Sequence, residues 1–117
     1  MRLPISMMIG CVFMMTGAAA FGASRKDHDD CNAADPDRNI AGCTRIIADI
    51  TEPKTTRAIA YVGRGLAWQA KGDLDRAISD FDQAISLDRN DADAYYRRSQ
   101  VFVEKGDLDH AITTSTR

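Results

Sequence analysis

The sequence lacks the residue groupings on which enzymes and metal sites rely. Its two histidines, His28 and His110, lie far apart, and no motif indicates a Ser/His/Asp or Cys/His catalytic grouping. Gly63-Arg64-Gly65 lies within a helical pattern, so it does not form a phosphate-binding loop after a strand. Asp29 and Asp30 are most simply solvating charge, and no recognised metal-ligand spacing appears. We therefore expect no catalytic residue, no metal and no cofactor.

Runs of positive charge are missing as well. The chain carries 15 basic and 17 acidic side chains, a formal net charge of −2, and its Lys and Arg residues are scattered. Affinity for nucleic acid rests on clustered positive charge, and so does the binding of an amphipathic helix to an anionic membrane surface. The composition argues against both kinds of partner.

No charged residue lies between Arg2 and Arg25, and most of that stretch is apolar. A basic start, an apolar middle and small residues before a polar stretch are typical of a secretory signal. Cleavage after Ala20 or after Gly22 would satisfy the small-residue requirement. We assign residues 1–22 to the signal, which predicts an exported protein, periplasmic or secreted, with no stable membrane insertion after cleavage.

Two other interpretations of this stretch stay open. The charge-free run is long enough to span a bilayer, so an uncleaved segment would anchor the protein, although Pro4, Gly10 and Gly17 make a poor lipid-embedded helix. Met8-Ile9-Gly10-Cys11 also weakly resembles a lipoprotein signal. If the signal is removed, Cys11 leaves with it and the even pair Cys31 and Cys43 remains, as fits a compartment where disulfides persist.

The rest of the chain contains an internal repeat. Lys71-Gly72-Asp73-Leu74-Asp75 recurs as Lys105-Gly106-Asp107-Leu108-Asp109, and 105 minus 71 gives a period of 34 residues. The same offset relates Tyr61 to Tyr95. A self-match at this period is typical of stacked helix-turn-helix units.

The repeat resembles the tetratricopeptide repeat family. The residues that carry the resemblance are Tyr61, Gly65, Trp68, Gly72-Asp73-Leu74, Ala77, Phe81, Ala84 and Leu87. It covers residues 58–112 well and residues 24–57 loosely. It implies an all-α fold, in which antiparallel helix-turn-helix repeats stack as a short right-handed solenoid of about 2.5 units. It also implies a small exported scaffold of the bacterial type that binds proteins and has no chemistry of its own.

Periodicity and capping residues predict where the helices lie. Asp35 and Pro36 start a helix over 36–50, whose apolar stripe is Ile40, Cys43, Ile47 and Ile50. A helix over 57–70 follows, capped by Thr55 or Thr56. Asp73 caps a helix that runs to residue 87, and another helix covers 91–104. Because Gly65 has no side chain, it is expected to let the following helix approach closely at Ala77.

The first repeat is degenerate because residues 27–34 have almost nothing apolar to bury. In this family the residues at Gly65 and Ala77 mark the point where two helices cross, and subtracting 34 places Cys31 and Cys43 there. The resemblance thus implies that a Cys31–Cys43 disulfide replaces the missing core and contributes roughly 3 kcal/mol. The alternatives are two reduced thiols packed as small hydrophobes, or a thiol-disulfide redox protein.

We divide the chain into a signal (1–22), a disulfide-stapled first repeat (23–57), a complete repeat (58–91) and a truncated repeat (92–117). The last is truncated because Phe81 corresponds to Ser115, so its second helix cannot complete the apolar stripe. That unfinished end supports an alternative function, an assembly module completed by a partner at its carboxyl end.

In this family the first helix of each repeat lines a groove that holds an extended peptide or a partner helix. The resemblance places the groove at Val62, Leu66, Gln69, Tyr96, Arg97, Gln100 and Val103. The glutamines can bond a peptide backbone, Tyr96 can stack, and Arg97 can pair with a carboxylate. The predicted partner is a protein or peptide.

Overall fold

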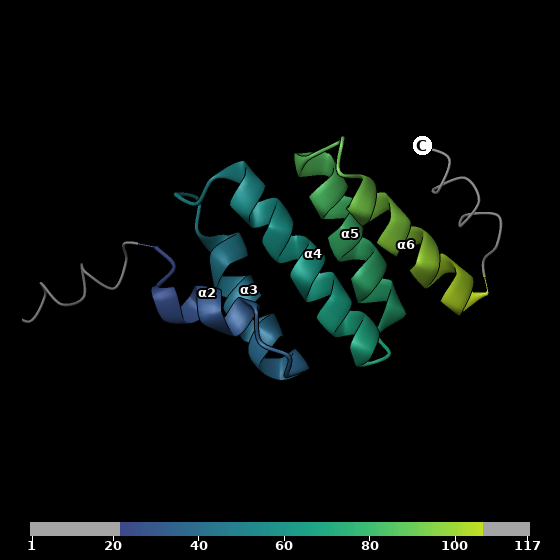
Figure 1. Ribbon diagram of the computed structural model, residues 1–117, viewed down its shortest axis with the longest axis horizontal. Coiled ribbons are helices and arrows are strands. Elements are labelled where there is room, and N and C mark those ends of the chain that lie inside the picture. Colours follow the sequence, from purple (N-terminus) through teal and green to yellow (C-terminus); the bar gives the residue numbers. More distant parts are fainter. Residues whose placement is uncertain (1–21, 107–117) are drawn as a thin grey trace, which may run out of the picture.

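The computed structural model describes residues 22–106, which form helices and contain no strand. In chain order these helices are α2 (Arg25–Cys31), α3 (Pro36–Ala48), α4 (Lys54–Ala70), α5 (Leu74–Leu87) and α6 (Ala92–Lys105). Figure 1 shows α2 and α3 at one end, α4 and α5 in the middle, and α6 beside α5. The predicted all-α fold is confirmed. Residues 1–21 of the predicted signal and the predicted second helix of the last repeat fall outside the described residues.

Side-chain caps start most of these helices. The Asp35 carboxylate accepts from the backbone N–H of Arg38 at the start of α3, and Asp73 accepts from that of Arg76 at the start of α5, as predicted. The predicted cap of α4 is wrong. That helix begins at Lys54, and its N-cap residue is Pro53, whose side chain has no hydrogen-bond acceptor, so the helix has no side-chain cap.

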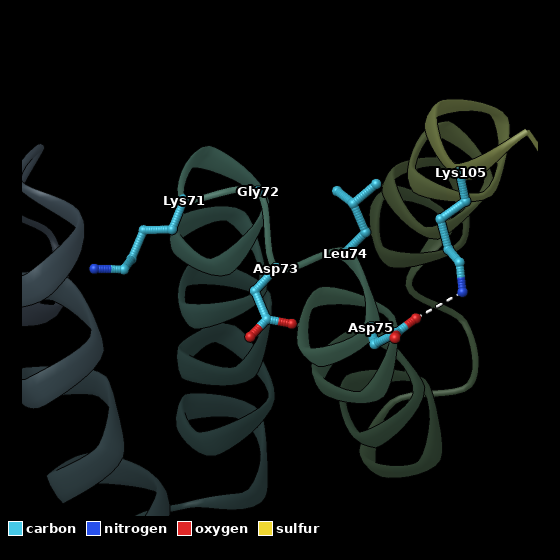
Figure 2. Close-up of a pocket in the computed structure, with 6 residues that line it drawn as sticks. All are labelled: Lys71, Gly72, Asp73, Leu74, Asp75 and Lys105. Atoms are coloured by element: carbon cyan, nitrogen blue, oxygen red, sulfur yellow. Dashed lines mark hydrogen bonds and ion pairs between the residues drawn. The ribbon is translucent and has the colours of Figure 1, made fainter.

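The repeated Lys-Gly-Asp-Leu-Asp sequence forms the turn between α4 and α5 (Figure 2). Gly72 has a φ of +84°, and its N–H donates to the carbonyl of Gln69 over 3.0 Å. The N–H of Asp73 donates to the carbonyl of Trp68 over 2.9 Å. These bonds satisfy the free carbonyls at the end of α4 and reverse the chain, as glycine permits. Beside this turn, Nζ of Lys105 lies 2.6 Å from the Asp75 carboxylate, linking the end of α6 to α5.

The main core lies where α4, α5 and α6 meet. Its buried members are Ala77, Phe81 and Val101, and Val62, Leu66, Trp68, Leu74 and Ile78 pack against them. A Cβ added at Gly65 would lie only 2.7 Å from the Phe81 ring, so the close approach at Gly65 includes this ring, and the predicted packing against Ala77 stays a prediction. The aromatic ring fills the space that the missing side chain leaves.

A second core, in the first hairpin, differs from the predicted stripe. Cys31, Cys43, Ile46 and Ala60 are buried together. The predicted helix over 36–50 is too long, because α3 ends at Ala48 and leaves Ile50 85 % exposed. Asp49 ends the helix. Its carboxylate accepts from the backbone N–H and the hydroxyl of Thr51, over 2.9 and 2.6 Å, and that turn competes with another helical turn.

Ion pairs support the short helix α2, which has little apolar surface. Asp30 is buried and its carboxylate contacts Lys26 and Arg38, while Asp27 contacts Arg45 on α3. The backbone N–H of Ser24 and the Arg45 guanidinium lower the pKa of Asp27 from 3.8 to about 2. Hydrogen bonds from Lys26 and Arg38 lower the pKa of Asp30. Both carboxylates are therefore ionised in the folded protein at neutral pH.

Candidate partner-binding face

The helices α4 and α6 present side chains with the same spacing, of three, four and three residues, so each set lies along one side of its helix. These residues are Ile59, Val62, Leu66 and Gln69 on α4 and Asp93, Tyr96, Gln100 and Val103 on α6. We call these eight residues the first-helix face. Each member on α6 lies 34 positions after its counterpart on α4, so the face follows the period of the repeat.

Hydrogen bonds connect the two halves of this face. Nε2 of Gln69 donates to Oε1 of Glu104 over 2.8 Å, which joins the end of α4 to the end of α6. Along α6, Nε2 of Gln100 donates to the Tyr96 hydroxyl over 3.2 Å. One hydrogen bond thus links the end of α4 to the end of α6, and the amide groups of Gln69 and Gln100 belong to the face together with its apolar side chains.

The exposed apolar side chains of this region gather on the first-helix face. Ile59 is 70 % exposed, Tyr96 57 % and Val103 52 %. One exposed hydrophobic residue needs no explanation, whereas several on the first-helix face of two helices that both pack on α5 mark a candidate contact surface. Ile59 was absent from the predicted groove. Its position three residues before Val62, on the stripe of Leu66 and Gln69, is the signal that would have found it.

The other predicted groove residues are less available. Val62 and Leu66 are half-buried and pack on the core around Phe81, so each offers only part of its surface. Arg97 lies one position outside the common spacing, and its Nε donates to the Asp93 carboxylate over 2.9 Å. That ion pair would have to open before Arg97 could bind a carboxylate of another molecule.

A hollow of about 330 Å³ continues this surface toward the first hairpin. It lies between α4 and the end of α2 with the turn that follows, and its lining is Cys31, Asn32, Ala33, Ala34, Pro36, Asn39, Gly63, Leu66, Ala67 and Ala70. Small residues on α4 leave the space open. Because Leu66 belongs to both surfaces, the hollow adjoins the first-helix face.

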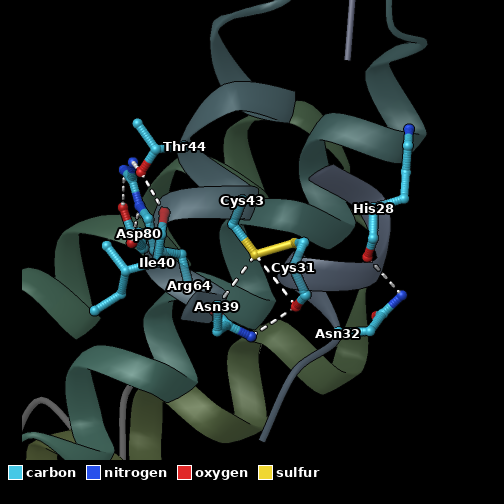
Figure 3. Close-up of a disulfide and its surroundings, with 9 residues drawn as sticks. All are labelled: His28, Cys31, Asn32, Asn39, Ile40, Cys43, Thr44, Arg64 and Asp80. Carbon is cyan, nitrogen blue, oxygen red and sulfur yellow. Dashed lines mark hydrogen bonds and ion pairs between the residues drawn. A yellow bond between two sulfur atoms is a disulfide. The ribbon is translucent and has the colours of Figure 1, made fainter. Parts of the chain in front are cut away.

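Cys31, which lines the hollow, is paired with Cys43 of α3 (Figure 3). The Sγ atoms of Cys31 and Cys43 lie 1.98 Å apart, at disulfide distance, and link α2 to α3. The Asn39 side-chain amide donates to the Cys31 carbonyl over 2.6 Å. Cys43 is fully buried and Cys31 is 9 % exposed, so an external thiolate has little access to either sulfur. This burial favours a structural bond over a redox-active one, and the oxidised state in the native compartment stays a prediction.

Among residues 22–106 there is no group of three or more His, Cys, Asp or Glu side chains that could hold a metal ion. Nε2 of His28 lies 3.0 Å from Oε1 of Glu52, a contact that joins α2 to the turn before α4. His110 falls outside the described residues. None of the helices in the described part of the chain is both long enough and apolar enough to cross a membrane.

Comparisons with known proteins agree with this geometry. Residues 65–106 match the family model described as TPR repeat, the abbreviation for tetratricopeptide repeat. The crystal structure of MamA is similar to this chain, with a TM-score of 0.70 and 23 % sequence identity, over 83 % of this chain and 56 % of the MamA chain. The chain thus spans little more than half of MamA. No curated protein matches the sequence. The described residues form an all-α, TPR-like solenoid, and residues 65–106 match the TPR repeat model.

Proposed function

We propose that the chain is an exported protein-binding module that holds an extended peptide or a partner helix along the first-helix face. The observation that carries this proposal is the exposure of the apolar side chains of Ile59, Tyr96 and Val103 on the first-helix face. Leaving these side chains in water forgoes the free energy of burying them, and a bound partner would recover it. TPR repeats commonly mediate contacts between proteins, which supports the same role.

The chemistry of the face indicates what the partner presents. Ile59 and Val103 would contact apolar side chains, and Tyr96 supplies a ring with a polar tip. Gln69 and Gln100 can exchange their present hydrogen bonds for bonds to a peptide backbone. Because Arg97 is already paired with Asp93, a free terminal carboxylate is a poor ligand here. We therefore propose an apolar internal segment of a protein as the ligand.

Export is part of the proposal and rests on other observations. The charge-free stretch before Arg25 has the pattern of a signal, and Cys31 and Cys43 stand at the distance of a disulfide. We place the module in the periplasm or outside the cell. Its role there is binding without catalysis.

Substitutions on the face test the binding role. The partner is first identified by crosslinking in the native cell envelope and mass spectrometry, and its affinity for the purified protein is then measured. Ile59→Glu and Tyr96→Ala should each weaken binding by about tenfold or more, as expected for central apolar contacts. Ile50→Glu is the matched control, because Ile50 is 85 % exposed in the turn after α3 and lies off the face. Equal affinities for all three variants would refute the proposal.

An assembly role is the second candidate, and Arg98 favours it. In the preceding repeat, Nε and Nη2 of Arg64 both donate to the Asp80 carboxylate over 2.8 Å. Arg98 occupies the equivalent position. Its Nη1 contacts Asp82, while its Nε is buried and has no hydrogen-bond partner within the part of the chain described. A partner helix carrying a carboxylate could satisfy this donor. Arg98→Gln should then weaken assembly, whereas Tyr96→Ala should not.

A further inference from the structure

Ala23 is held by a carboxylate that the fold has oriented for it. The backbone nitrogen of Ala23 donates to Oδ2 of Asp49 over 2.6 Å. Oδ1 of the same carboxylate accepts from the backbone N–H and the hydroxyl of Thr51. These Thr51 bonds, followed by the bond from Ala23 and the charge of Arg57, lower the pKa of Asp49. The carboxylate is therefore ionised and fixed in place before anything binds to Oδ2.

Ala23 is also where the packed fold begins. Its side chain packs against the core of the first hairpin, and Ser24 caps α2 through a reciprocal pair of bonds with Asp27. Gly22 is exposed, with a φ of +107°, and a Cβ added there would lie 2.4 Å from the Asp49 carboxylate. The contact with Asp49 thus leaves no room for a side chain immediately before Ala23.

We infer that the leader is cleaved between Gly22 and Ala23, and that the amine released at Ala23 is bound as an ammonium ion by Asp49. This inference rests on the proposed export. An endopeptidase would add water across the Gly22–Ala23 bond. Gly22 becomes a carboxylate on the released leader, and the Ala23 amine takes a proton from solvent. Ala20 and Gly22 supply the small side chains that signal cleavage requires.

Cleavage strengthens an existing contact. In the uncleaved chain Oδ2 of Asp49 accepts a bond from the neutral Ala23 amide, whereas after cleavage it faces a cation, and charge-assisted hydrogen bonds are stronger. The new positive charge lies at the amino end of α2, where the helix dipole disfavours it, so the carboxylate has to compensate. The other charged residues around this site are Asp27, Arg45 and Arg57. Because Arg45 and Arg57 are also positively charged, the Ala23 ammonium depends on the Asp49 carboxylate to balance its charge.

The first test is the amino terminus of the exported protein. The full-length chain is expressed in a bacterium, and the processed protein is identified by intact mass and by N-terminal sequencing. A chain that begins at Ala23 supports the inference. A chain that begins at Phe21 or elsewhere would leave export standing and overturn the inference, whereas an uncleaved membrane-bound chain would overturn export too.

The second test is the reactivity of the new amine. Asp49 should raise the pKa of the Ala23 amine, so at pH 8 its acylation should be about fivefold slower in the processed wild-type protein than in Asp49→Asn. Asp29→Asn is the matched control, because it removes one negative charge from the exposed surface of α2 and should leave the rate unchanged. Circular dichroism verifies that each variant is folded. Equal rates in wild type and Asp49→Asn would show that the ammonium is not bound as inferred.

Discussion

Arg64 of α4 and Asp80 of α5 form a bidentate ion pair, in which Nε and Nη2 of the guanidinium each lie 2.8 Å from a carboxylate oxygen. Nη1 of Arg64 also donates to the Thr44 hydroxyl of α3 over 3.1 Å. One side chain thus joins three helices from two successive hairpins. Asp80 is buried, and its carboxylate raises the pKa of Arg64, so the cation is held firmly.

Asp80→Ala should lower the free energy of unfolding by about 3 kcal/mol, because it leaves a largely buried guanidinium without its carboxylate. Urea denaturation followed by circular dichroism measures the change. The control is Asp75→Ala on the same helix, where the largely exposed carboxylate pairs with the partly exposed Lys105 and should contribute at most about 1 kcal/mol. Equal losses for the two variants would contradict the role given to Asp80.

Alanine substitutions at two glycines of α4 should change the stability of the protein in opposite directions. Gly65→Ala should destabilise the protein by about 1–3 kcal/mol, because the new Cβ would meet the fully buried Phe81 ring at 2.7 Å. Gly63→Ala places its Cβ 3.5 Å from Sγ of Cys43, an ordinary contact, so the gain in helix propensity should stabilise the protein by up to about 1 kcal/mol. Thermal melts of both variants supply the comparison, and a stabilised Gly65→Ala would refute the packing at Phe81.

The cysteine pair should contribute to stability when it is oxidised. Reduction of the Cys31–Cys43 bond should cost roughly 3 kcal/mol, since the bond closes a short loop between α2 and α3. Denaturation with and without dithiothreitol measures this loss. A Cys31→Ala, Cys43→Ala variant should match the reduced protein and be insensitive to the reductant. If the stability of the wild-type protein is the same with and without the reductant, a stabilising disulfide is ruled out.

Stability should fall in acid because of Asp27. Its pKa in the folded protein is about 2, below the ordinary 3.8, so its contribution is complete above about pH 4 and is lost as the pH falls through 2. The Asp30 pKa is lowered as well, and it acts in the same direction. Urea midpoints measured from pH 6 to pH 2 should decline, and Asp27→Asn should flatten part of that decline. An equal slope in the variant would place the acid sensitivity elsewhere.

Periodicity was sufficient to predict the helices and the core of the complete repeat. The 34-residue self-match located the turn at Gly72 and Asp73, and it placed Phe81 in the core, because every repeat buries the same positions against its neighbours. The same reasoning overextended α3. The hydrophobic pattern continued to Ile50. The helix nevertheless ends at Ala48, because the Asp49 carboxylate accepts hydrogen bonds from the backbone N–H and the hydroxyl of Thr51. A side chain that forms a local turn in place of another helical turn leaves no trace in the hydrophobic periodicity of the sequence.

The candidate face was only partly predictable for related reasons. The repeat phase found Tyr96, Gln100 and Val103, because first helices recur in a fixed orientation. It did not show that Arg97 would pair with Asp93, since a sequence with many charges allows many pairings. Ile59 was missed because the resemblance placed the groove only from Val62 onward, whereas the same stripe extends one turn further toward the start of α4.

Site-specific photo-crosslinking in the native cell envelope tests the central claim most directly. A photoreactive residue is placed at Ile59 or at Tyr96 on the first-helix face, and at Asp82 on the exposed side of α5 as the reference. We predict that one and the same protein is crosslinked from Ile59 and Tyr96 and is absent from Asp82. Crosslinking of that protein from Asp82 with equal yield, or from Asp82 alone, would contradict a partner bound along α4 and α6.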